Sequence, residues 1–407
     1  MSSSHTPPAP YRRARAATAV LFLTNGALFA NLLPRYPEIK DSLGLSDGVF
    51  GIAVAAFPAG AILFGLLAAR LVRAFGSGLI AAVFTALVAV GLLGASLAPS
   101  LWVLMLCLLI AGGADAVADV SQNEHALRVQ AGYHRSIINS LHAVWSLGGV
   151  LGGVMAAGAV GLTLPLPVHL SLSGAMFTLA AVGAWWWMLP RQHTGTAPGQ
   201  VSIESHPTPG KRCRLPIRWS SLGFLLVLVL IGNTGTMVED VGNSWAALYL
   251  SEERGTSPIV ATMGFTTLIT GQLMGRLVAD PLINRFGLRP ILSLGGALIG
   301  LGLGVALLFP SVWGTILGVG IAGYGSAALV PGAYDQAHRI PGLPEGTGVT
   351  LVSWLMRIGF LITPPVVGAL AEVSELRWAL LVVPAAGVLT MWLARWIPDT
   401  QTAGARA

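Results

Sequence analysis

Long apolar stretches alternate with short polar segments along almost the whole chain. An α-helix needs about twenty apolar residues to cross the hydrocarbon core of a bilayer. Twelve stretches reach roughly this length, at 16–33, 48–70, 79–98, 101–126, 137–161, 167–189, 220–250, 258–280, 289–309, 311–337, 346–370 and 376–397. Glycine and proline recur inside them, which membrane bundles tolerate. The pattern predicts an all-α, polytopic membrane protein with twelve transmembrane helices.

Composition agrees with a chain that lies in the lipid bilayer. Hydrophobic residues make up 54% of the 407 residues and charged residues only 10%, with a mean hydropathy of +0.73. Soluble domains carry about a quarter charged residues, so this chain lacks the charge to cover a water-exposed surface. The net charge of +6 does not indicate a nucleic-acid partner, because the basic residues fall in short segments between the apolar stretches.

The basic residues are distributed unequally between the two sides of the predicted bundle. With the N-terminus in the cytoplasm, 18 of the 23 lysine and arginine residues lie on the cytoplasmic side. The opposite side holds four, and one falls inside a predicted helix: Arg35, Lys40, Arg254 and Arg377, and Arg357. The positive-inside rule then predicts that both termini are cytoplasmic, and we expect a bacterial inner membrane.

The start of the chain and the cysteines bear on targeting. Basic residues precede the first apolar stretch, as in a signal peptide, but the stretch runs to Leu33 and continues into Pro34-Arg35-Tyr36-Pro37 instead of a small-residue cleavage site. We therefore expect a retained first helix.

Cys107 lies in an apolar stretch and Cys213 in a basic segment, which predicts free thiols and no disulfide.

The second half of the chain repeats features of the first at a constant distance of 211 residues. The matching pairs are Pro99-Ser100 with Pro310-Ser311, Trp102 with Trp313, Ala111-Gly112 with Ala322-Gly323, Gly76 with Gly287, and Gly148 with Gly359. We expect six-helix bundles at 16–189 and 220–397, a cytoplasmic linker at 190–219, and cytoplasmic tails at 1–15 and 398–407. Parallel repeats with a binding site near the midplane between them are a transporter architecture.

The segment around the end of the predicted eighth helix carries a recognisable motif. It reads Gly275-Arg276-Leu277-Val278-Ala279-Asp280 and then Arg285-Phe286-Gly287-Leu288-Arg289. Together with the repeat, it resembles the cytoplasmic loop motif of the major facilitator superfamily. The resemblance implies a gating loop in which Asp280 caps a helix and pairs with Arg276, Arg285 or Arg289 around Gly287. Ala69 takes the equivalent position in the first half, so the acid is missing there.

Further segments are similar to the fucose-permease-like branch of that superfamily and its bacterial relatives. They are Asp119-Val120-Ser121-Gln122-Asn123, Leu141 to Gly149, Trp245 to Leu250, and Gly359-Phe360 with Pro364-Pro365 and Gly368. The resemblance implies that Asp119 is a proton-coupling acid and that Asn123 contacts the substrate. The sugar symporters of the branch also have an acid on the first helix, where this chain offers only Asn25 and Asn31. Of these two, Asn31 is the substrate-binding candidate.

Ionisable groups inside membrane segments are costly and usually face a cavity or a partner. Asp115 and Asp119 are four residues apart and share one helix face, where their repulsion favours protonation of one carboxylate. Either aspartate can instead be permanently paired with a basic group. Arg357 lies near the middle of the predicted eleventh helix. It can contact an anionic substrate, form a structural ion pair with Glu239, Asp240, Asp335 or Asp119, or switch partners during transport.

Other polar and aromatic residues complete the set of candidate substrate-binding residues. Glu239 and Asp240 point about 100° apart on the seventh helix, and Glu239 is the one we place toward the cavity. His142, Trp145 and Tyr324 can line the same cavity or pack in the core.

Motifs of reactive chemistry are absent from the sequence. There is no Walker A, HExxH, GxSxG or CxxC pattern, and Lys40 and Lys211 are the only lysines. We therefore expect no enzyme, no cofactor and no metal. The resemblance to the superfamily implies a monomer. The hypothesis is a secondary active transporter of a small solute, with proton-coupled symport first. The alternatives are a proton-driven exporter of drugs or metabolites and, more remotely, a transporter-like receptor without net flux.

Overall fold

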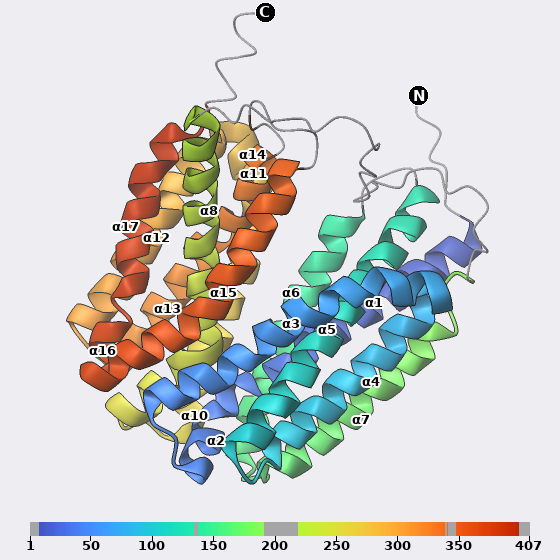
Figure 1. The fold of residues 1–407 in the computed structure, drawn as a ribbon, viewed down its shortest axis with the longest axis horizontal. Helices are drawn as coiled ribbons and strands as arrows, with labels where there is room; N and C mark the ends of the chain where they lie inside the picture. The colour runs from blue at the N-terminus through green and yellow to red at the C-terminus, as the bar shows by residue number, and fades with distance from the viewer. Residues whose placement is uncertain (1–7, 134–136, 191–218, 338–339, 341–346, 399–407) are drawn as a thin grey trace, which may run out of the picture.

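The computed structural model describes residues 8–133, 137–190, 219–337, 340 and 347–398, and within them it forms two helical bundles (Figure 1). The first bundle consists of α1 (Ala9–Ala30), η1 (Leu33–Arg35), α2 (Tyr36–Leu43), α3 (Asp47–Phe75), α4 (Ser77–Ser96), α5 (Leu101–Ala131), α6 (Ile138–Gly161) and α7 (Leu166–Trp185).

The second bundle is interrupted more often. It consists of α8 (Trp219–Asp240), η2 (Val241–Trp245), α9 (Ala246–Leu248), η3 (Tyr249–Glu253), α10 (Pro258–Ala261), α11 (Met263–Phe286), α12 (Leu288–Leu308), α13 (Val312–Ser326), α14 (Leu329–Ala337), α15 (Thr347–Val373), α16 (Leu376–Ala379), α17 (Val382–Leu393) and η4 (Ala394–Trp396). The segments η2 and η3 are π-helical: η2 joins α8 to α9, and η3 continues directly from α9.

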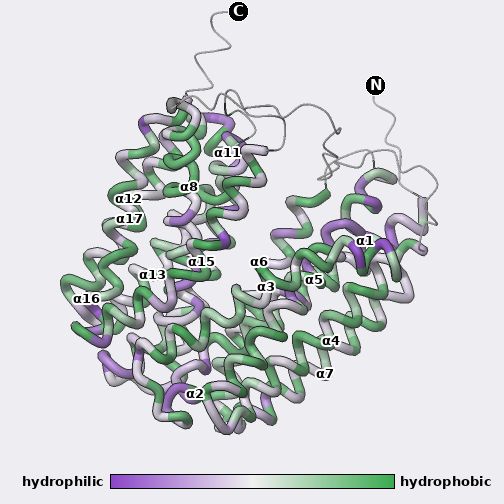
Figure 2. The backbone as a smooth tube through the Cα atoms, in the orientation of Figure 1, coloured by the Kyte–Doolittle hydropathy of each residue, from purple (hydrophilic) through white to green (hydrophobic). Residues whose placement is uncertain are grey.

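The twelve predicted helices are confirmed in number and order. Eleven helical spans among the described residues are long and apolar enough to cross a membrane. The twelfth is α11, which has 24 residues and packs between α6 and α13, but is less apolar. Outward-facing positions on the other helices are hydrophobic, for example Val90 on α4 and Leu179 on α7, 65% and 71% exposed. Figure 2 shows this hydrophobic character along α4 and α7.

Several boundaries differ from those expected from the sequence. Helix α1 begins at Ala9, well before the expected residue 16, because the polar segment up to Arg15 continues as helix. Helix α11 runs on to Phe286, past the expected end at 280. The proposed linker at 190–219 and the tail at 398–407 lie almost entirely outside the described residues.

The internal repeat extends to the backbone. Gly76 and Gly287, which are 211 residues apart, both have positive φ, at 89° and 88°, where a side chain would be strained. A methyl group at Gly112 would collide with the carbonyl oxygen of Phe57, and one at Gly323 would collide with that of Leu268, at the same spacing. Small residues thus let corresponding helices approach closely in both bundles.

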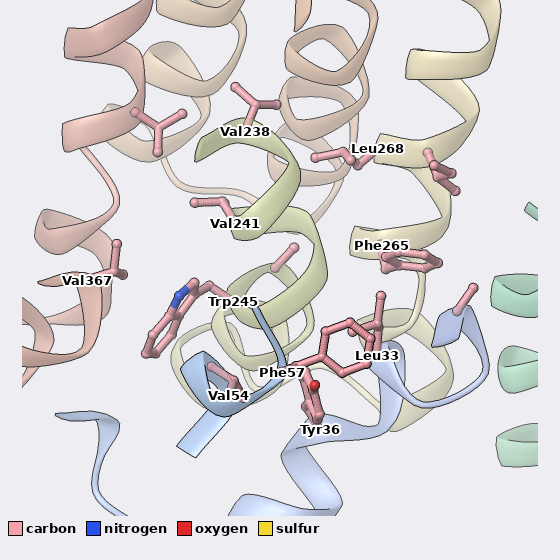
Figure 3. Packing of buried hydrophobic residues seen from close by; sticks show 14 of the residues in the cluster. Leu33, Tyr36, Val54, Phe57, Val238, Val241, Trp245, Phe265, Leu268 and Val367 are labelled. Carbon is pink, nitrogen blue, oxygen red and sulfur yellow. The ribbon is translucent and has the colours of Figure 1, made fainter. Parts of the chain in front are cut away.

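The two bundles meet at the end of the molecule opposite the chain termini, which we call the closed end (Figure 1). There α3 packs against α15, and α2 against α9. Apolar side chains from both bundles fill this contact, including Tyr36 and Val54 from the first and Val241 and Trp245 from the second (Figure 3). The bundles diverge toward the end that carries both termini.

Candidate functional site

A hydrogen-bonded chain links three helices of the first bundle. Asn25 on α1 donates from Nδ2 to Asp115 Oδ1 on α5 at 2.8 Å, and its Oδ1 accepts from Trp145 Nε1 on α6 at 2.8 Å. Asn25 is 9% exposed, so both of its amide atoms are committed to these neighbours. These hydrogen bonds orient two predicted site residues, Asp115 and Trp145. Asn25, which makes both bonds, was not among the predicted site residues.

One helical turn further along α5 lies Asp119. Its Oδ1 accepts hydrogen bonds from Asn123 Nδ2 at 3.0 Å and, more weakly, from Gln122 Nε2 at 3.4 Å. His142 on α6 and Arg357 on α15 both act on it electrostatically. The imidazole of His142 also packs edge-on against Phe22, with ring centroids 5.3 Å apart. Asp119 is thus surrounded by polar groups without a salt bridge in the described part of the chain.

Arg276 reaches from the second bundle to the first. Its Nη1 donates to Ser146 Oγ on α6 at 2.7 Å, and its guanidinium lies 5.6 Å from the centroid of the Trp145 ring. Glu239 on α8 acts on it electrostatically. The resemblance counts Arg276 among the residues of a gating loop, but the residue lies inside α11. The residue lies ten positions before the end of α11, because that helix continues through Pro281 to Phe286.

Arg357 is exposed on α15, and no carboxylate lies within salt-bridge distance of it among the described residues. Arg357 acts electrostatically on Asp119, one of the four acids considered as its partners. Asp335 instead accepts from Gln336 Nε2 at 2.9 Å. A fixed structural ion pair is therefore not formed in this conformation, and the guanidinium keeps its hydrogen-bonding capacity for another ligand.

Glu239 and Asp240 diverge as helix geometry requires. Glu239 is half-buried beside Arg276, whereas Asp240 is 2% exposed. Asp240 Oδ1 accepts only a long hydrogen bond, 3.4 Å, from Ser244 Oγ. Glu239 is therefore the acid of this pair that interacts with Arg276, one of the polar residues between the bundles.

Two predicted residues lie apart from this group. Asn31 is fully buried, with Nδ2 bonded to the carbonyl of Ala27 and Oδ1 bonded to His169 Nε2, both at 2.8 Å. Tyr324 lies on α13, where its backbone packs against Gly271 and Gly275 of α11, and its side chain is half-buried. The structure does not bring either of them together with Asp119.

The residues of the expected gating loop form the end of a helix and one turn. Asp280 is exposed on α11 and forms no salt bridge among the described residues, so the expected pairing with arginine is not present in this conformation. Arg285 packs over the ring of Phe286 at 5.1 Å. Gly287 alone connects α11 to α12, and Arg289 is exposed in the first turn of α12.

Sequence reasoning missed the polar contacts that join the bundles at the closed end. Lys40 on α2 donates to both carboxylate oxygens of Glu252 on η3, at 2.7 and 2.8 Å, and lies 2.9 Å from Asp47. Glu372 on α15 accepts from Ser46 Oγ and from the backbone N–H of Gly48. The unequal charge distribution singled out Lys40, but nothing in the sequence indicated a partner 212 residues away.

Acidic, basic and polar side chains of the two bundles therefore interact across the interface between them. Asp115, Asp119 and His142 belong to the first bundle, and Arg276 and Arg357 to the second. Such a set can bind a small polar solute and exchange protons. No three histidine, cysteine or acidic side chains in the described ranges lie close enough to hold a metal ion.

This fold, with polar side chains gathered between two bundles, defines a membrane transporter. The Major Facilitator Superfamily profile matches residues 18–239 and 224–407, and the chain belongs to this superfamily. The likeness to the superfamily is thereby confirmed, whereas the fucose-permease-like branch stays a prediction.

Individual relatives support the assignment. The chain is 26% identical to Membrane protein MosC of Rhizobium meliloti over 389 residues, 96% of this chain and 91% of that protein. It is 26% identical to the Uncharacterized transporter y4wD of Sinorhizobium fredii over 362 residues, 89% and 92% of the two chains.

Solved structures show the same fold. The nucleoside transporter NupG superposes with a TM-score of 0.65 at 13% identity, covering 96% of this chain and 99% of that one. A bacterial homolog to the human lysosomal transporter Spinster, in an inward-facing and occupied conformation, superposes with a TM-score of 0.70 at 14% identity, covering 96% and 97%.

Proposed function

We propose that this protein is a proton-coupled secondary transporter that moves a small polar or amphipathic solute across the bacterial inner membrane by alternating access. The observation that carries the proposal is the pair Asp115 and Asp119 on α5, placed among amide and basic side chains between the bundles. Charges at this depth of a membrane protein are costly and generally functional.

Asp119 is the proposed proton carrier. Its hydrogen-bond partners are the neutral amides of Asn123 and Gln122, so its charge is not fixed by a salt bridge within the described residues. Arg357 of the second bundle, which acts on Asp119 electrostatically, stabilises the carboxylate when the proton leaves. Asp115 is bonded to Asn25, which makes it the second candidate.

Arg357 is the proposed contact for an oxygen-rich or anionic group of the solute. Its guanidinium is exposed and has no carboxylate within salt-bridge distance in the described part of the chain, and its planar donors suit a carboxylate. Trp145, which is held by Asn25 and contacted by Arg276, is the proposed surface for the apolar part of the solute.

Both termini are proposed to be cytoplasmic. The positive-inside distribution supports this orientation. The end that carries the termini is the one toward which the bundles diverge, so this conformation corresponds to an inward-facing state in that orientation (Figure 1). The superposed homolog of Spinster is also in an inward-facing conformation.

The test is solute-driven proton movement in proteoliposomes that carry a pH-sensitive dye. Purified protein in detergent is first screened by thermal shift against sugars, small organic anions and drug-like cations, because ligand at about a hundred times its Kd adds roughly 2.7 kcal/mol. The stabilising solute is then added outside the vesicles. Symport acidifies the lumen as the solute enters, whereas an exporter moves protons against the solute.

Asp119→Asn should abolish solute-driven proton movement while solute binding persists. The matched control is Glu124→Gln, because Glu124 is an exposed acid on the same helix. Proton movement that continues at the parent rate in Asp119→Asn would overturn the coupling role.

A further inference from the structure

We propose that Asp240 on α8 is a second proton-binding site. It holds a proton while the two bundles are in contact at the closed end and releases the proton when they separate there. The site is distinct from Asp119, and it ties proton binding to the position of the bundles instead of to the solute. The inference rests on the proposed function in one respect only, namely that the bundles alternate between two arrangements.

Asp240 is buried without a partner for its charge. Its side chain is 2% exposed, and Oδ2 has no hydrogen-bond partner. Oδ1 receives one long hydrogen bond from Ser244, and no salt bridge to Asp240 exists among the residues that the structure describes. An unpaired carboxylate is far more expensive to bury than a neutral carboxylic acid, so this buried position selects the protonated form.

Among the described residues, no positively charged group acts on Asp240. Glu239, which precedes it on α8, acts on it electrostatically, and Asp240 in turn acts on Tyr36 of α2 in the first bundle. Both neighbours are acids. The base that interacts with this acidic pair is Arg276 on α11, and its partner is Glu239. Ser244, one turn further along the same helix, is neutral.

The backbone at this position is unusual as well. The π-helical segment η2 begins directly after Asp240, and π-turns inside helices frequently mark functional sites. Trp245 Nε1 and Tyr249 Oη, on the same helical run, are also buried without hydrogen-bond partners. Three polar side chains, each with one buried atom that lacks a hydrogen-bond partner, therefore follow one another along the part of the second bundle that contacts the first.

This stretch lies in the apolar contact that seals the closed end. Trp245 packs edge-on against Phe50 of α3 at 5.6 Å, and Phe50 packs against Tyr36 at 5.4 Å. Figure 3 shows Val241 and Trp245 among side chains of the first bundle. When the closed end opens, Tyr36 and Phe50 must leave, and water reaches the helix that carries Asp240.

Hydration reverses the protonation preference. A hydrated aspartic acid, with a usual pKa of about 3.9, is ionised at neutral pH, whereas burial favours the protonated form. Because binding and conformation are linked reciprocally, a proton on Asp240 favours closure and its loss favours opening. Lower pH on the side that the closed end faces should therefore stabilise the closed arrangement.

The experiment measures distances across the closed end by electron–electron double resonance. Spin labels are placed at Asp41→Cys on α2 and Ser374→Cys after α15, both exposed, in a background in which Cys107 and Cys213 are replaced by serine. Samples without solute are compared at mildly acidic and mildly alkaline pH. In the parent, the short-distance population should grow several-fold as the pH falls.

Asp240→Asn should keep the short-distance population high at both pH values, because asparagine imitates the protonated acid. Asp240→Leu, of similar width and also without a proton site, serves as a second variant if the first folds poorly. The control Glu375→Gln removes an exposed acid at the same end and should retain the pH response of the parent.

A pH response of parental size in both Asp240 variants would overturn the proposal, as would a parent without any response. The two proposals fail separately. If Asp119→Asn leaves proton coupling intact, the proposed function is refuted. The distances across the closed end then still test the role of Asp240.

Discussion

Lys40 joins the two bundles at the closed end, and its removal should shift the conformational equilibrium. Its Nζ lies 2.7 and 2.8 Å from the oxygens of Glu252 on the second bundle and 2.9 Å from Asp47 on the first. The side chain of Lys40 is 10% exposed and that of Glu252 is 32% exposed. The contact with Glu252 crosses between the bundles, so it exists only while this end is closed.

The magnitude follows from the number and exposure of these bonds. Hydrogen bonds to charged groups contribute about 1.5–3 kcal/mol. The partial exposure of Glu252 reduces this value, because water and salt screen the pair. Lys40→Met, which keeps the length of the side chain, should therefore destabilise the closed arrangement by about 1–2 kcal/mol, a shift of roughly 5- to 30-fold toward opening.

The assay is the double-resonance distance between labels at Asp41→Cys and Ser374→Cys, measured without solute. Glu38→Gln is the matched control, because the bridge from Arg35 Nε to Glu38, 2.6 Å long, lies within α2 and its junction with η1. That variant removes a salt bridge at the same end without crossing between bundles. A parental distance distribution in Lys40→Met, or an equal shift in Glu38→Gln, would refute the reasoning.

Three further predictions concern stability, measured by thermal unfolding in detergent. Gly112→Ala should lower stability by about 1–3 kcal/mol through its collision with α3, whereas Gly158→Ala, with no atom within 4 Å of the added methyl group, should not. Arg377→Met should cost about 1–3 kcal/mol, because the guanidinium donates to two carbonyls at the end of α12, at 2.6 and 2.9 Å. Asn25→Ala should cost a similar amount, since it leaves the Trp145 indole N–H unsatisfied.

Each of these has an outcome that would contradict it. Equal melting temperatures for the two glycine variants would show that α3 and α5 are not closely packed at Gly112. If Arg377→Met has the stability of the parent, water replaces the hydrogen bonds of the guanidinium without a loss of stability. For Asn25→Ala, parental stability would show that the hydrogen-bonded chain between α1, α5 and α6 does not form.

Fold could be predicted from the sequence because it depends on the partition of residues between lipid and protein. An apolar stretch of sufficient length must become a helix in the bilayer, where every backbone group needs an internal partner. Even α11, which is too polar to count among the eleven apolar spans, is predicted in this way, although the expected end at 280 falls short of Phe286. Pro281 and the charged residues near it are typical of a loop, yet they lie in the last turns of α11.

The candidate site could be predicted only in its local part. The spacing of Asp115 and Asp119 fixes them to one face of α5, and the neighbouring positions of Glu239 and Asp240 force them apart. Which of the latter pair is buried, and in what surroundings, depends on how α8 is rotated against α2 and α11. Periodicity within one helix carries no information about that rotation.

The chain by itself therefore determined the twelve helices, their repeat at 211 residues and the rarity of charge within them. Only the tertiary structure decided that Arg276 bonds to Ser146, that Asn31 is sealed in the core, and that Lys40 meets Glu252. The physical reason is that hydropathy acts on each residue separately. Contacts between distant residues depend on helix tilt, rotation and close packing, which all twelve helices set together.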